Sequence, residues 1–259
     1  LMVCNFQQPV RYFDLNSSMA DTLVFIHGLG CASSYEYVPI AFFEMMKKYR
    51  IILVDLIGFG YSDKPSRFEY TIDNHATCVF DLLSTITNRN IILYGHSMGG
   101  AVAITLASML GPSLKFLILS ESNLDTGGGF FSKKIASYDR NAYLESGHKI
   151  MIRESLSERN THWASTMLNS LPQAVYEGAK SLVDGGRINW RNTLYEISSK
   201  SAFIYGEKSL PDSDYEKLKS HGIHLEIVPK AGHSMSVENT SGLATAIENC
   251  IKHLTIAST

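Results

Sequence analysis

The sequence predicts an α/β fold built on a mainly parallel sheet, and two patterns support this prediction. Short apolar runs rich in β-branched residues recur along the chain, and segments with helical spacing of apolar residues separate most of them. Inner strands of a parallel sheet are buried on both faces, so they appear as continuous apolar runs. The alternation of such strands with helices indicates a layered α/β architecture.

The elements follow from these patterns in chain order. An edge hairpin is expected within residues 1–20, with a turn at Gln7–Pro9. Six buried strands are predicted, at Leu23–Ile26, Ile51–Val54, Ile91–Tyr94, Leu114–Leu119, Ala202–Tyr205 and Ile223–Val228. Core helices are predicted at Ile72–Ile86, Met98–Leu110 and Val237–Leu254.

The segment from Asp125 to Ile197 interrupts this alternation. It holds no convincing buried strand, but it has helix-like stretches such as Arg140–Arg153 and Thr161–Leu171. Glycine pairs or runs lie near both of its ends, where hinges or tight turns are expected. We therefore predict a helical cap at residues 125–197, inserted into a core made of residues 1–124 and 198–259.

Composition excludes several classes of protein. The chain has 259 residues, of which 45% are hydrophobic, which is enough to bury a sizeable core. Its formal net charge of −2 provides no basic excess for nucleic acid or anionic lipid. The four cysteines are scattered without a CxxC pair, so we expect neither a metal site nor a disulfide framework. The chain is expected to be cytoplasmic, without a membrane span, and a homodimer is left open.

The strongest candidate for chemistry lies at residues 95–100, which read Gly-His-Ser-Met-Gly-Gly. A predicted strand precedes this motif and a predicted helix follows it, which is the setting of a nucleophilic serine at a sharp turn. Small residues are needed two positions away on each side, and Gly95 and Gly99 meet this need. We therefore predict that Ser97 is the nucleophile rather than an ordinary helix-capping serine.

A serine nucleophile needs a base, and His233 is the candidate. Residues 231–235 read Ala-Gly-His-Ser-Met, directly after the last predicted strand. A loop at that place lies at the carboxyl edge of the sheet, as does Ser97. His96, next to the nucleophile, is expected to have a structural role. The other histidines, His162 included, show no partner spacing and are interpreted as solvated or packed.

A second glycine-containing loop follows the first buried strand, where residues 27–30 read His-Gly-Leu-Gly. Glycine there lets the backbone approach a ligand closely. The backbone amides of Leu29 and Met98 are predicted to stabilise an oxyanion together. The loop Asp55–Ser62 is interpreted as scaffold.

With these motifs in order, the chain resembles the α/β-hydrolase superfamily over nearly its whole length. The resemblance implies an eight-stranded, mostly parallel sheet, a cap after the sixth strand, and a Ser-His-acid triad. The chain departs from the usual pattern after the seventh strand, where Ser209 occupies the position of the acid. Some relatives place the acid after the sixth strand, and Glu121 is similar to that pattern. Glu121 is therefore the predicted acid, with Glu207, Asp212 and Asp214 as alternatives.

The predicted function is hydrolysis of small carboxylic esters through an acyl-enzyme, without cofactor or metal. Phe130, Phe131, Tyr138 and Trp163 are expected to line the pocket. Carbon–carbon bond hydrolases, lactonases and thioesterases use the same triad, so they remain alternatives. A non-catalytic ligand-binding protein on the same scaffold is a further alternative, because Ser209 replaces the usual acid.

Overall fold

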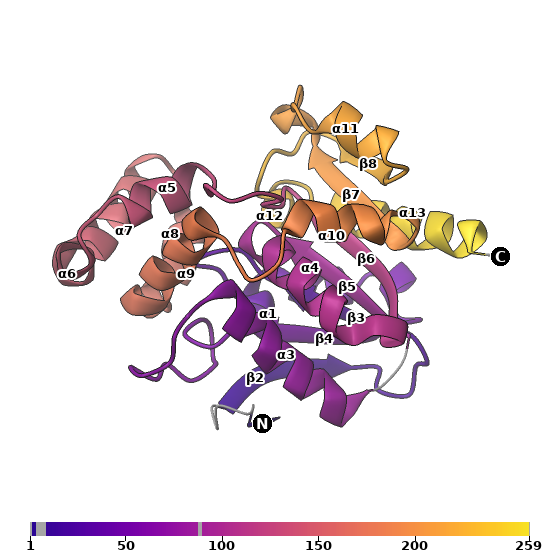
Figure 1. Cartoon of the computed structure of the whole chain (residues 1–259), viewed down its shortest axis with the longest axis horizontal. Helices are drawn as coiled ribbons and strands as arrows, with labels where there is room; N and C mark the ends of the chain where they lie inside the picture. The colour runs from indigo at the N-terminus through magenta and orange to yellow at the C-terminus, as the bar shows by residue number, and fades with distance from the viewer. Residues whose placement is uncertain (1, 4–8, 88–89, 259) are drawn as a thin grey trace.

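The structure, a computed structural model, describes residues 2–3, 9–87 and 90–258 (Figure 1). Its strands form one eight-stranded sheet in the order β1-β2-β4-β3-β5-β6-β7-β8. β1 and β2 are antiparallel to their neighbours and the other strands are parallel, which confirms the predicted fold class. The strands are β1 (Met2–Val3), β2 (Pro9–Leu15), β3 (Thr22–Ile26), β4 (Arg50–Asp55), β5 (Ile91–His96), β6 (Leu114–Ser120), β7 (Ser201–Gly206) and β8 (His224–Val228).

All six predicted strands form at the predicted places, and five of them are inner strands. The prediction of a buried strand at Ile223–Val228 was wrong, because β8 is an edge strand and most of its residues are only partly buried. The expected edge hairpin is also present as the β1–β2 pair, but Gln7 and Gln8 of its predicted turn lie outside the described residues.

β3 illustrates how the inner strands are buried on both faces of the sheet. Val24 and Ile26 join one apolar cluster, whereas Leu23 and Phe25 join the cluster on the opposite face. This period of two is the geometry of a strand between two helical layers.

Helices cover both faces of the sheet. They are α1 (Ser33–Glu36), α2 (Val38–Ala41), α3 (Ile72–Ile86), α4 (Met98–Leu110), α5 (Phe130–Ala136), α6 (Arg140–Ala142), α7 (His148–Ser157), α8 (Thr161–Leu168), α9 (Pro172–Asp184), α10 (Trp190–Glu196), α11 (Tyr215–Ser220), α12 (Met235–Glu238) and α13 (Thr240–Ala257). A π-helical turn, Tyr143–Gly147, joins α6 to α7.

Three predicted helices differ from the structure. The one expected at Arg140–Arg153 is interrupted by the π-helical turn and ends at Ser157. The helix expected at Val237–Leu254 is split at Asn239, whose side chain accepts a hydrogen bond from the Gly242 amide and so starts α13. The helix expected at Thr161–Leu171 ends at Leu168. Leu171 is extended because Pro172 follows it, and the proline ring disfavours a helical residue before it.

The segment between β6 and β7 consists of helices joined by loops and contains no strand among its described residues. Its glycine turns lie against each other: the Gly127 amide donates to the Val183 carbonyl, and Gly185 lies beside Thr126. Helices α5 to α9 form a group on one side of these two glycine turns, while α10 runs along α4 (Figure 1). There Trp190 Nε1 donates to Thr105 Oγ1 over 3.2 Å. The boundaries 125 and 197 for a cap domain stay a prediction.

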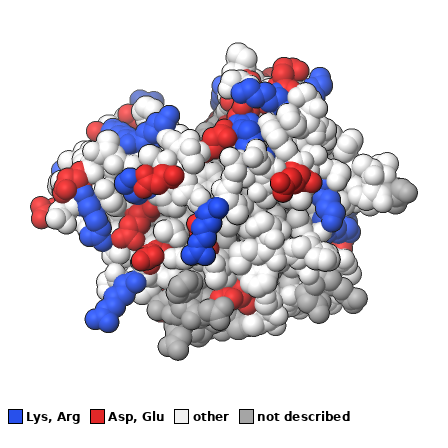
Figure 2. All heavy atoms as spheres, in the orientation of Figure 1, with Lys and Arg blue, Asp and Glu red and all other residues white. Residues whose placement is uncertain are grey.

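The surface charge is mixed on the face shown in Figure 2, where Lys and Arg side chains lie among Asp and Glu side chains. Within the described residues, no helix is both long and apolar enough to cross a membrane.

Candidate active site

Ser97 lies at the turn between β5 and α4, at the carboxyl edge of the sheet. Its backbone has φ 54° and ψ −120°, a conformation that is strained for a residue with a side chain. A Cβ at Gly95 would come within 2.5 Å of the Gly99 carbonyl oxygen, and one at Gly99 would collide with the Ile26 carbonyl oxygen. The tight turn therefore requires glycine at both places, as the motif predicted.

The turn is attached to the neighbouring strand. The Ser97 amide donates to the Ser120 carbonyl over 3.0 Å, and the Asn123 amide donates to the Ser97 carbonyl over 3.3 Å. The Ser97 side chain makes no capping hydrogen bond to α4. The hydroxyl is thus not used as an ordinary helix cap.

His233 lies in the loop after β8, and His96 holds that loop. His96 Nε2 donates to the His233 carbonyl over 2.8 Å, which fixes the His96 proton on Nε2 because a carbonyl can only accept. Burial, together with the nearby His233 ring, lowers the pKa of His96 to about 4. His96 is therefore neutral at physiological pH, and its structural role is to position the backbone of His233.

Glu121 follows β6 in a left-handed conformation, with φ 45°. Its Oε1 accepts from the Gly206 amide over 2.8 Å, and its Oε2 lies 3.8 Å from His233 Nδ1. This second distance is that of an ion pair and is longer than a hydrogen bond. Burial acts to raise the pKa of Glu121, but the interactions with His233, Gly206 and Ser209 together lower it, so the carboxylate is ionised at neutral pH.

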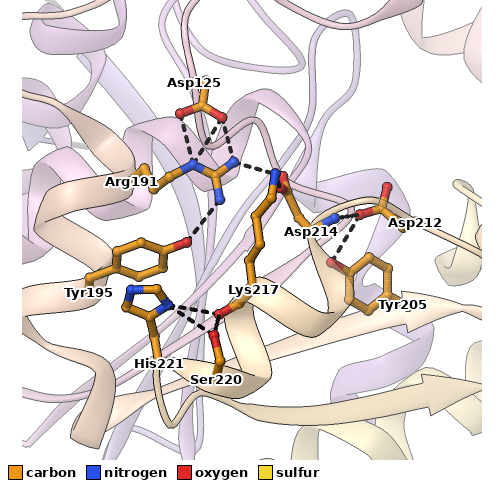
Figure 3. A network of polar contacts seen from close by, with 9 residues as sticks. All are labelled: Asp125, Arg191, Tyr195, Tyr205, Asp212, Asp214, Lys217, Ser220 and His221. Atoms are coloured by element: carbon orange, nitrogen blue, oxygen red, sulfur yellow. Dashed lines mark hydrogen bonds and ion pairs between the residues drawn. The ribbon is translucent and has the colours of Figure 1, made fainter.

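The alternative acids are engaged elsewhere. Glu207 accepts from the Lys230 amide over 2.8 Å. Asp212 accepts from Tyr205 and from the Asp214 amide, and Asp214 pairs with Arg191 and Lys217 (Figure 3). Among the described residues, Glu121 is the only carboxylate within ion-pair distance of His233.

The loop after β3 is held rigidly next to the turn. The Leu56 amide donates to His27 Nε2 over 3.0 Å, so His27 Nδ1 carries the proton and donates to the Gly28 carbonyl. Trp163 Nε1 donates to the Leu29 carbonyl over 2.8 Å. The Leu29 amide has no acceptor among the described residues, and the Met98 amide, at the first turn of α4, has none within its helix. Both amides remain available for a ligand.

A cavity of about 450 Å³ connects these parts. Ser97, His233, Glu121 and Leu29 line it, and so do the expected Phe130, Phe131 and Trp163. The expectation for Tyr138 was wrong: its ring packs on Tyr143, and its carbonyl accepts from Tyr176.

Asp55 accepts from both the amide and the hydroxyl of Ser34 and from the Tyr61 amide, so its loop is scaffold as predicted. No group of three or more metal-binding side chains is present in the described part of the chain.

Comparison with known proteins settles the family. The sequence model described as alpha/beta hydrolase fold matches residues 21–167. The chain belongs to the α/β-hydrolase fold family. It is 33% identical to a 2-hydroxymuconate semialdehyde hydrolase from Pseudomonas sp. (strain CF600) over 80% of this chain and 71% of that protein.

Two further matches show how far the likeness extends. Lipase 3 from Moraxella sp. (strain TA144) is 31% identical over 52% of this chain, and the match spans only 41% of the lipase. A thermophilic esterase from Thermogutta terrifontis has the same fold, with a TM-score of 0.77 at 19% identity over 95% of this chain and 94% of that chain.

Two cavity residues of this α/β hydrolase were missed by sequence reasoning. Glu36, at the end of α1, is only 5% exposed, and its Oε1 lies 3.0 Å from His162 Nε2 on α8. Tyr35 stacks on the His162 ring. The two partners are 126 positions apart, so no local spacing could have indicated the pair. The only feature of the sequence that could have indicated Glu36 is that it is a single acidic residue among mostly uncharged neighbours.

Proposed function

We propose that this α/β hydrolase is a serine hydrolase that cleaves carboxylic esters through an acyl-enzyme. The observation that carries the proposal is that Ser97, at its strained turn, shares one cavity with the His233–Glu121 pair. The curated and structural relatives include a lipase and an esterase, which supports esters as the default substrate class.

The reaction follows from the positions of these groups. Ser97 Oγ attacks the ester carbonyl carbon while the His233 imidazole takes the hydroxyl proton. The negative charge that forms on the carbonyl oxygen is stabilised by the amides of Leu29 and Met98. Collapse of this intermediate breaks the bond to the alcohol, which leaves with the proton from His233. Water then attacks the acyl-enzyme by the same route and releases the acid.

In this proposal Glu121 orients His233 and stabilises its protonated form. The separation of 3.8 Å needs to shorten by less than 1 Å to become a hydrogen bond, and such bonds tighten when substrate is bound. The Ser209 hydroxyl then has a role that the sequence did not indicate, because it helps to lower the pKa of the Glu121 carboxyl. No step requires a cofactor or a metal.

A second candidate is a non-catalytic ligand-binding protein. The long His233–Glu121 distance favours it, since an imidazole that is not held by its acid is a weak base. The two candidates differ in one property, which is whether Ser97 reacts.

The test is intact-mass labelling with a fluorophosphonate, together with turnover of p-nitrophenyl acetate and butyrate. Wild type should label once and turn over both esters, whereas Ser97→Ala should do neither. Glu121→Gln should lower kcat by roughly 10³–10⁴-fold, as is typical when the acid of a triad is neutralised. The matched control, Asp212→Asn, should behave like wild type.

Two other outcomes would change the proposal, each in a different way. A slow Asp212→Asn with a normal Glu121→Gln would move the acid to the segment after β7. A wild type that neither labels nor turns over would favour the ligand-binding protein.

A further inference from the structure

The cavity next to Ser97 has an unusual balance of charges. Two carboxylates line it, Glu36 and Glu121, and no Lys or Arg is present among the described lining residues. The remaining lining is mostly apolar, aromatic or uncharged polar. Any charge that a substrate carries into this space is therefore met by negative charge and not by a fixed cation.

Glu36 is a buried carboxylate with a hydrogen-bond partner on only one of its oxygens. Its Oε1 pairs with His162, but its Oε2 is buried and has no hydrogen-bond donor among the described residues. Burial acts to raise the pKa of Glu36, but the hydrogen bond from His162 lowers it overall, so the group is ionised at neutral pH. A carboxylate charge in a poorly solvated cavity wall is little screened, so it repels an anionic group of a substrate over several ångströms.

The other ionisable groups around Glu36 do not cancel this charge fully. His96 is neutral, since burial lowers its pKa to about 4. Cys31 lines the same wall, and burial and Glu36 raise the pKa of its thiol, which leaves it uncharged. His162 is the group that pairs with Glu36 through a hydrogen bond, and it reaches only one of the two carboxylate oxygens.

We propose that this site selects esters without a carboxylate, either uncharged or cationic, and that Glu36 is the residue that discriminates against anionic substrates. The proposal rests on the proposed function and names its substrate class. It separates this chain from the 2-hydroxymuconate semialdehyde hydrolase, whose name denotes a carboxylate substrate. Phe131 and Trp163, whose ring centroids lie 4.5 Å apart, add aromatic lining that suits apolar groups.

The experiment compares two esters that have the same shape but different charge. Mono-p-nitrophenyl succinate carries a terminal carboxylate, and p-nitrophenyl levulinate carries a methyl ketone in its place. We measure kcat/KM for both near neutral pH, after subtracting the rate with Ser97→Ala. Wild type should prefer the levulinate by about tenfold or more, on the order expected for one charge several ångströms away.

Glu36→Gln should raise the succinate-to-levulinate ratio of kcat/KM by about tenfold, because the amide keeps the shape and removes the charge. The matched control, Glu216→Gln, makes the same change on the exposed surface of α11 and should leave the ratio as in wild type. A merely structural role for Glu36 would lower both rates together and would not move the ratio.

A second variant protects the test against misfolding of Glu36→Gln. Phe130 lines the cavity and is 77% exposed, so Phe130→Lys adds a cation at the mouth without disturbing the core. It should raise the relative rate for the succinate ester. Equal wild-type rates for the two esters, or a ratio unmoved by these variants, would overturn the selectivity while leaving the hydrolase function intact. Failure of both esters would instead count against the proposed function.

Discussion

At the scale of single residues, Glu121 and Ser209 bear on the proposal that the acid follows β6 and not β7. β6 and β7 are neighbours in the sheet, so a residue after either strand lies beside the same loop. Glu121, after β6, lies at ion-pair distance from His233, and Ser209 contributes to lowering the pKa of that carboxylate. An aspartate at 209 would place two like charges side by side.

We therefore expect that the proposed acid can be moved from position 121 to position 209. In a Glu121→Gln background, Ser209→Asp should restore at least tenfold of the lost kcat, because the new carboxylate can take over the imidazole. In the wild-type background the same substitution should lower activity, through repulsion between the two carboxylates. Turnover of p-nitrophenyl butyrate by the two single variants and the double variant measures this. If the double variant is no faster than Glu121→Gln, position 209 is out of reach of His233.

At the scale of secondary-structure elements, α3 carries a polar residue on its buried face. His75 is fully buried, with the rings of Phe59, Phe68 and Tyr70 around it. Neither ring nitrogen has a hydrogen-bond partner among the described residues. Burial, reinforced by the nearby His27, lowers the pKa of His75 to about 3. The helix therefore folds against the sheet with a neutral, unpaired imidazole.

The consequence is a loss of stability in mild acid. The unfolded chain binds a proton at His75 near pH 6.5, whereas the folded chain does so only near pH 3, so protonation favours unfolding as the pH falls below 6.5. His75→Phe removes this contribution. Between pH 7 and 5 the wild type should lose about 2 kcal/mol more free energy of unfolding than the variant. Urea unfolding at the two pH values measures the difference, and parallel losses would show that His75 is protonated in the folded state.

At the scale of the whole molecule, the helices between β6 and β7 share an apolar cluster with the sheet. Ile26 and Leu119 of the sheet belong to the same buried cluster as Trp163, Met167 and Leu194 of that segment. Exposing either part would therefore expose apolar surface of the other. We expect the two parts to unfold together.

The two tryptophans offer a direct measurement of this coupling, since both Trp163 and Trp190 belong to the helical segment. Their fluorescence should follow the same urea transition as the far-ultraviolet circular dichroism of the whole chain. Trp190→Phe leaves Trp163 as the sole reporter of helices α5 to α9 and should show the same midpoint. A fluorescence transition at lower urea would instead mean that this segment opens independently of the sheet.

What the sequence determined by itself is local in character. Buried strands, the turn around Ser97 and the loop at 27–30 each depend on residues close together in the chain, because apolar periodicity and glycine clearance act over a few positions. These features predicted the sheet, the order of its motifs and the candidate residues Ser97 and His233, whereas Glu121 came from the resemblance to relatives with an acid after the sixth strand. The break at Asn239 was missed because a single capping side chain overrode an otherwise helical pattern.

Only the tertiary structure decided which distant groups meet. It brought Glu36 to His162, placed His96 beneath the His233 backbone, and directed Asp212 and Asp214 into a separate network. It also removed Tyr138 from the cavity by packing it on Tyr143. Such contacts depend on how the elements pack across the fold. The spacing of residues along the chain predicts neighbours within one helix or strand, but it does not predict contacts between residues that lie far apart in the sequence.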